Sequence, residues 1–81
     1  MDNNEYLKNQ VSILINLFEA RRFEDLIDKG LVLIKKFPEQ AIFYNITSLA
    51  YNAIYKSEEA KKILVKIQKK QPRNISVLNN L

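Results

Sequence analysis

The 81-residue sequence predicts an all-α protein built from antiparallel helical hairpins, and three observations predict it. Apolar residues make up 47% of the chain and recur at the i, i+3, i+4 spacing that gives a helix an apolar face. One glycine and two prolines are too few for the many turns of a sheet protein. The stretch KKFPEQAIFYN at 35–45 is echoed by KKQPRNISVLN at 69–79, with the lysines, proline and last asparagine at the same offsets. The echo predicts a structural unit that repeats every 34 residues.

The first predicted helix, about 4–20, is apolar around more than half of its circumference. Its large apolar residues are Tyr6, Val11, Ile13, Leu14, Ile15, Leu17 and Phe18. A helix of this kind is expected to touch neighbours on two sides.

The second predicted helix begins near Phe23 and has one apolar stripe. The stripe consists of Phe23, Leu26, Ile27, Gly30, Leu31 and Ile34. Acidic residues occupy its first turn and lysines its last turn, as the helix dipole favours. Pro38 should end the helix, because proline lacks an amide and disfavours a helical conformation at the preceding residue. The two segments form a first hairpin, about 4–37.

The second hairpin, about 39–71, repeats this design. Its first helix, about 39–54, is again apolar on two sides, with Ile42, Phe43, Tyr44, Ile46, Leu49, Ala50, Tyr51 and Ile54. Its second helix has one stripe, formed by Ala60, Ile63, Leu64 and Ile67. Ser57 is expected to cap this helix and Pro72 to end it. Residues 73–81 then match the start of a third unit, and 1–81 form a single domain.

The 34-residue period and these positions resemble the tetratricopeptide repeat (TPR) family along nearly the whole chain. The second unit places residues at the positions of the family pattern as follows: Tyr44, Thr47, Ser48, Tyr51, Ala60, Leu64 and Pro72. The first unit departs from the pattern, because Leu14 and Leu26 stand where the family has small residues. The resemblance implies a short right-handed α-solenoid of stacked hairpins. A four-helix bundle of another kind is the alternative.

The composition excludes several kinds of site. Without cysteine or histidine, the chain has no disulfide, no thiolate or histidine metal site, and no catalytic base of these types. The carboxylates Glu19, Glu24 and Asp25 lie beside Arg21 and Arg22, which favours surface ion pairs over catalysis. We therefore expect a protein that is not an enzyme and uses no metal or cofactor. The polar N-terminus does not resemble a signal peptide, so a cytoplasmic setting is expected.

The resemblance implies that the concave side, lined by the first helix of each hairpin, binds a peptide or a partner helix. The residues expected on that side are Lys8, Val11, Ile15, Phe18, Glu19, Ile42, Asn45, Leu49 and Asn52. For Val11, Ile15 and Leu49, an ordinary core position is an equally good interpretation. Asn45 could bond an extended peptide through both groups of its amide.

Self-association is also expected, because repeats of this kind usually need about three units to bury their faces. The segment after Pro72 is too short to be stable as a free helix. Its apolar residues are candidates for a homodimer contact: Ile75, Val77, Leu78 and Leu81. The ending in the middle of a motif fits the N-terminal adaptor of a longer protein, and it fits equally a short protein that closes its array by dimerising.

An alternative function is binding to nucleic acid or to another anionic surface. The chain carries a net charge of +4, and seven cations gather on and around the fourth predicted helix. They are Lys56, Lys61, Lys62, Lys66, Lys69, Lys70 and Arg73. Few exposed aromatic residues are interleaved with them for base stacking, so a solvated helix face is the simpler interpretation.

Overall fold

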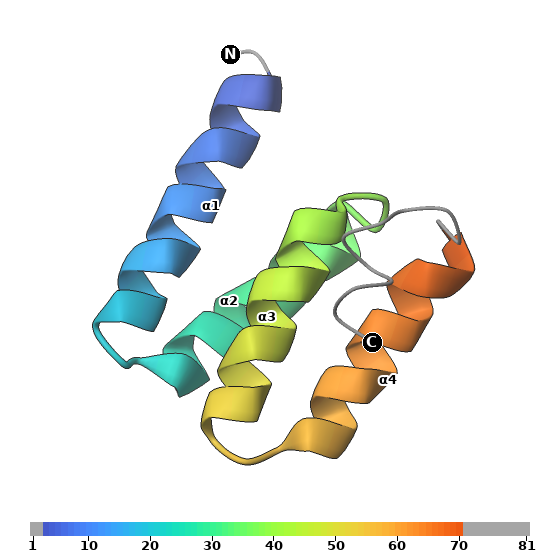
Figure 1. The fold of residues 1–81 in the computed structure, drawn as a ribbon. Helices are drawn as coiled ribbons and strands as arrows, with labels where there is room; N and C mark the ends of the chain where they lie inside the picture. Colours follow the sequence, from blue (N-terminus) through green and yellow to red (C-terminus); the bar gives the residue numbers. More distant parts are fainter. Residues whose placement is uncertain (1–2, 71–81) are drawn as a thin grey trace.

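The structure is a computed structural model that describes residues 3–70, and this part of the chain is all-helical, as predicted. Its helices are α1 (Asn3–Glu19), α2 (Phe23–Lys36), α3 (Ala41–Ala53) and α4 (Ser57–Lys70). In Figure 1, α1 and α3 run in one direction while α2 and α4 run in the other. The predicted pairs 4–37 and 39–71 therefore appear as two antiparallel hairpins, and the predicted helix at 73–81 lies outside the described residues.

The helix boundaries agree with the predictions except at the starts of α3 and α4. The end of α2 before Pro38 is confirmed, and the amide of Phe37 still donates to the carbonyl of Leu33 at 2.8 Å. The chain then turns until Gln40, so α3 begins two residues later than expected. The prediction that Ser57 caps α4 is wrong. The carbonyl of Lys56 accepts the first helical bond, from the amide of Ala60 at 3.2 Å, which makes Lys56 the cap residue.

The turns within the two hairpins have the same backbone geometry. Arg21 and Tyr55, 34 residues apart, both have positive φ angles, of 59° and 64°. In the first turn the amide of Arg22 donates to the carbonyl of Leu17 at 2.9 Å, and in the second the amide of Lys56 donates to the carbonyl of Tyr51 at 2.9 Å. Inside each of these bonds a second one spans three residues, from the amide of Arg21 to Phe18 and from that of Tyr55 to Asn52, so both turns are Schellman motifs. The 34-residue period thus extends from the sequence to the hydrogen bonds.

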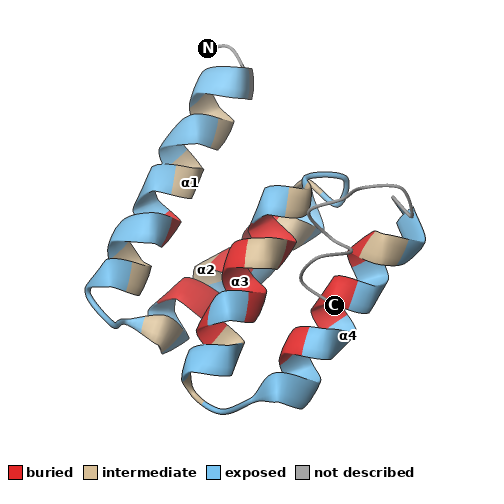
Figure 2. Cartoon of the chain, in the orientation of Figure 1, coloured by how far each residue is buried: buried red, intermediate tan, exposed pale blue. Residues whose placement is uncertain are grey.

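The helix α3 lies at the centre of the packing. Its backbone approaches those of α1, α2 and α4, whereas α4 comes close to α3 alone among the described helices. One core cluster joins α1, α2 and α3 and includes Leu14, Leu26 and Phe43. A second cluster joins α3 to α4 through Tyr44, Ile63 and Ile67. Figure 2 shows the buried residues concentrated on α2, α3 and α4.

Residue size sets how closely the helices approach. A Cβ atom at Gly30 of α2 would overlap Oγ1 of Thr47 on α3, so the missing side chain allows this close contact. Small residues at Ser48 and Ala60, both 2% exposed, lie where α3 meets α4. Leu14 and Leu26 are fully buried, and α1 approaches α2 over less of its length than α3 approaches α4. The hairpin with the larger side chains at these two positions thus has the less extensive helix contact.

Candidate interaction face on α1 and α3

The predicted binding residues form one stripe on each of two neighbouring helices. Lys8, Val11, Ile15, Phe18 and Glu19 lie on α1, and Ile42, Asn45, Leu49 and Asn52 lie on α3. Within each set the spacing is three or four residues, with Phe18 and Glu19 adjacent, which places the set on one side of its helix. The helices α1 and α3 approach each other and run in the same direction. We call the two stripes together the α1–α3 face.

Three aliphatic side chains on the α1–α3 face are open to solvent. Ile15 is 45% exposed, Ile42 is 42% exposed and Leu49 is 49% exposed. The interpretation of Ile15 and Leu49 as core residues is therefore wrong for this structure. Val11 and Phe18 are half-buried and pack against the first core cluster, so they combine a core position with the edge of the face.

The polar residues of the face differ in accessibility. Lys8, Glu19 and Asn52 are exposed. Asn45 is partly buried, and its Oδ1 is shielded from solvent with no hydrogen-bond partner among the described residues. In this arrangement the oxygen is not open to a peptide backbone, so the expected use of both amide groups of Asn45 is not supported.

Two open hollows lie at opposite ends of the seam between α1 and α3. Lys8 and Val11 line the first, together with Gln40 just before α3. Phe18 and Glu19 line the second, together with Ala53 at the end of α3. The structure thus brings four of the predicted α1 residues into hollows that α3 helps to close. Gln40 and Ala53 were missed by the sequence prediction, although Ala53 is 34 residues after Glu19 and could have been found by extending the repeat.

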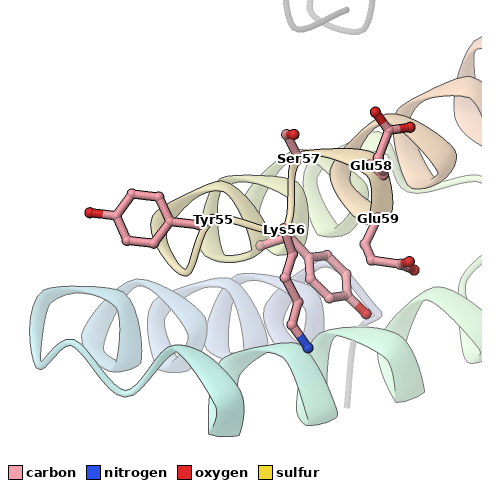
Figure 3. Close-up of a pocket in the computed structure, with 6 residues that line it drawn as sticks. Tyr55, Lys56, Ser57, Glu58 and Glu59 are labelled. Carbon is pink, nitrogen blue, oxygen red and sulfur yellow. The ribbon is translucent and has the colours of Figure 1, made fainter.

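A further hollow surrounds the start of α4, but its side chains do not converge. Figure 3 shows Tyr55 extending away from the helices, with Ser57 and Glu58 on one side of the chain and Lys56 and Glu59 on the other. Tyr55 is 95% exposed. Groups that diverge in this way cannot act together on one small ligand. This hollow is therefore a weaker candidate than the α1–α3 face.

Two tyrosines beside α4 have raised pKa values. Burial raises the pKa of Tyr44, with a smaller contribution from the negative charge of Glu39. The hydroxyl of Tyr44 donates to the carbonyl of Pro38 at 2.8 Å. Burial also raises the pKa of Tyr51, with further contributions from Glu59 and Asp28. Both side chains stay protonated at neutral pH; Tyr44 acts as a hydrogen-bond donor, and Tyr51 packs against the second core cluster.

The cations predicted for anionic binding lie mostly on the surface of α4. Lys56, Lys61, Lys62, Lys66, Lys69 and Lys70 are exposed, and Arg73 lies outside the described residues. Nζ of Lys62 lies 3.7 Å from Glu59, and Nζ of Lys70 lies 3.5 Å from Glu39. Contacts of this kind on the surface bring little stability. The lysines therefore remain available to an anion.

Of the carboxylates beside the first hairpin turn, Asp25 forms the expected surface ion pair. Nη2 of Arg22 lies 2.6 Å from Oδ2 of Asp25, and both side chains are more than half exposed. Across residues 3–70, no group of three or more histidine, cysteine or acidic side chains could hold a metal ion. None of the helices in that range is long and apolar enough to cross a membrane. The self-association candidates Ile75, Val77, Leu78 and Leu81 lie outside the described residues.

Comparison with known proteins identifies no relative. No protein-family model, no curated protein and no solved structure matches the chain.

Proposed function

We propose that this chain is a protein-interaction module whose α1–α3 face binds an apolar helix or an extended peptide. The observation that carries the proposal is the exposure of Ile15, Ile42 and Leu49 on two helices that contact each other. Exposed aliphatic residues gathered on one face mark interaction sites more often than free surface. Half-buried Val11 and Phe18 extend the apolar surface toward the core.

We further propose that the four helices form two stacked units of a TPR-like right-handed solenoid. The repeated turn geometry at Arg21 and Tyr55 supports this arrangement. The position of α3, which touches both its hairpin partner α4 and the preceding α1 and α2, also supports it. In such a stack each unit contacts only its neighbours. The α1–α3 face then lies on the inner side of the array.

The proposal is tested with an immobilised library of amphipathic helical peptides probed by the purified chain. We expect some peptides to bind the wild-type chain but not the Leu49→Glu and Ile15→Glu variants. In these variants docking would bury a charge, which opposes apolar contact. Val32→Glu is the matched control, since Val32 is 53% exposed at the middle of α2. It should leave binding unchanged.

Stability measurements make this result interpretable. Leu49→Glu changes an exposed position, so its free energy of unfolding should stay within about 0.5 kcal/mol of the wild type. Thermal melting followed by circular dichroism checks this. Peptides that bind Leu49→Glu as tightly as wild type would contradict the proposed face. A variant that unfolds would show instead that Leu49 belongs to the core.

A second candidate function is anionic binding through α4, supported by the row of exposed lysines at 61, 62, 66 and 69. Each phosphate contact releases counterions, so the affinity for single-stranded RNA should fall steeply as salt rises. A fluorescence anisotropy titration at two salt concentrations checks this. Binding that is absent at low salt, or insensitive to salt, contradicts this function. The exposed aromatic nearest to these lysines in the sequence is Tyr55, which offers little for base stacking.

A further inference from the structure

We infer that the occupant of the α1–α3 face is a second copy of this chain, docked in an antiparallel two-fold arrangement with α1 against α1 and α3 against α3. The inference rests on the proposed interaction face and names its partner. The two charges of the face lie at opposite ends of one stripe, and only one docking geometry brings opposite charges of the two copies together.

The α1–α3 face carries one cation and one anion, at opposite ends of its stripe of residues on α1. Lys8 and Glu19 are both exposed, and neither forms an ion pair with another residue in the described range. They are separated along the helix axis by about 16 Å at the usual rise per residue. Ile15 is exposed between them. The stripe on α1 is therefore apolar in the middle and oppositely charged at its ends.

The 34-residue repeat places an apolar counterpart beside each charge. Ile42 of α3 corresponds to Lys8, and Ala53 corresponds to Glu19. Glu19 and Ala53 line the same hollow at one end of the seam. At the other end Lys8 shares a hollow with Gln40, two residues before Ile42. One helix thus offers charged ends to a partner and the other offers apolar ends.

A face of this kind can meet its own copy through two different two-fold axes. An axis parallel to the helices would place α1 on the partner's α3, setting each charge against an apolar residue. That arrangement leaves two cations and two anions desolvated without partners, which is costly. An axis perpendicular to the helices reverses the helix direction and places α1 on α1. Each Lys8 then meets the partner's Glu19, and each Ile42 meets the partner's Ala53.

The perpendicular axis therefore gives favourable contacts on both α1 and α3. It forms two equivalent ion pairs on α1 and two apolar contacts on α3, as an isologous interface requires. Ile15 and Leu49 are enclosed between these ends, which removes exposed aliphatic surface from water. Two short helical stripes bury less than the roughly 800 Å² per partner of a standard interface. We expect a dimer in the micromolar range.

Charge reversal tests the pairing. Lys8→Glu alone sets two glutamates together at each end, and Glu19→Lys alone sets two lysines together. Each variant should dimerise about tenfold more weakly than wild type in sedimentation equilibrium. An equimolar mixture of the two variants should form heterodimers with an affinity within about threefold of wild type, because one chain then carries both anions and the other both cations, so opposite charges meet at each end. Lys66→Glu is the matched control, since it makes the same charge change on the exposed side of α4.

Cysteine cross-linking tests the helix direction. The chain has no cysteine of its own, so introduced thiols report cleanly. Lys8→Cys with Glu19→Cys in one chain should give a disulfide-linked dimer under mild oxidation. The two positions on one helix exceed the roughly 7 Å limit for a disulfide between Cα atoms, so the bond cannot form within a chain. Lys8→Cys alone should stay unlinked.

The outcomes separate this inference from the proposed function. A wild-type chain that stays monomeric up to about 500 µM overturns the self-docking, because a dimer of micromolar affinity would be mostly associated at that concentration. A mixture that fails to restore dimers, or single-cysteine variants that cross-link as fast as the double variant, overturns the antiparallel arrangement. If the chain is a monomer and still binds peptides in a way that depends on Leu49, the proposed function stands and only the dimer is contradicted. A dimer insensitive to Leu49→Glu rejects the α1–α3 face altogether.

Discussion

At the scale of single residues, Gly30 shows how one missing side chain determines a helix contact. Gly30→Ala would normally favour a helix by about 1 kcal/mol. Here the added methyl group would meet Oγ1 of Thr47, which is fully buried. Overpacking of this kind costs about 1 to 3 kcal/mol, so we expect a net loss in the free energy of unfolding measured by urea denaturation.

A double variant isolates the cause of that loss. Thr47→Ala removes the atom with which the new methyl group collides, and it also removes a buried hydroxyl that has no hydrogen-bond partner in the described part of the chain. Gly30→Ala in that background should therefore cost less than in the wild type. Equal costs in the two backgrounds would show that the contact with Thr47 is not what requires glycine.

At the scale of helices, the sequence predicted the elements well because their signals are local. The apolar spacing and Pro38 place α2 within its observed bounds. Leu14 and Leu26 depart from the family pattern, and α1 approaches α2 less extensively than α3 approaches α4. The left-handed backbone at Arg21 and Tyr55 carried no sequence signal, since such positions usually hold glycine. The prediction that Ser57 caps α4 was wrong because the Schellman turn ends at Lys56, whose carbonyl already accepts the first hydrogen bond of α4.

The ends of the hairpins can be stabilised at those left-handed positions. Tyr55 is 95% exposed and points away from the helices, so its side chain contributes little to packing. Tyr55→Gly should raise the free energy of unfolding by about 1 kcal/mol relative to Tyr55→Ala, because glycine avoids the steric cost of a positive φ angle. Thermal denaturation of the two variants checks this. No difference between them would contradict the strained turn.

At the scale of the whole molecule, the repeat predicted which residues share the exposed face but not how far each of them is buried. Ile15, Ile42 and Leu49 were placed on one face by their spacing, and the structure leaves all three exposed. The half-burial of Val11 and Phe18 depends on how α1 leans on the core, which spacing alone does not determine. The shielded oxygen of Asn45 likewise depends on neighbouring side chains. Periodicity predicts which residues share a face, and packing decides which of them a partner can reach.

The same uneven packing predicts how the molecule opens. Of the described side chains of α1 only Leu14 is buried, whereas α3 contributes six buried residues and lies between neighbours. An isolated helix of this length is marginal in water, so α1 should detach before the rest unfolds. Native-state hydrogen exchange at about 10 µM should therefore give a lower opening free energy for amides of α1 than for those of α3. Docking of a second copy on the α1–α3 face would cover α1, so its protection should rise at about 500 µM in the wild type and stay constant in Leu49→Glu. Equal opening free energies for α1 and α3 at the lower concentration would show that α1 unfolds only with the whole chain.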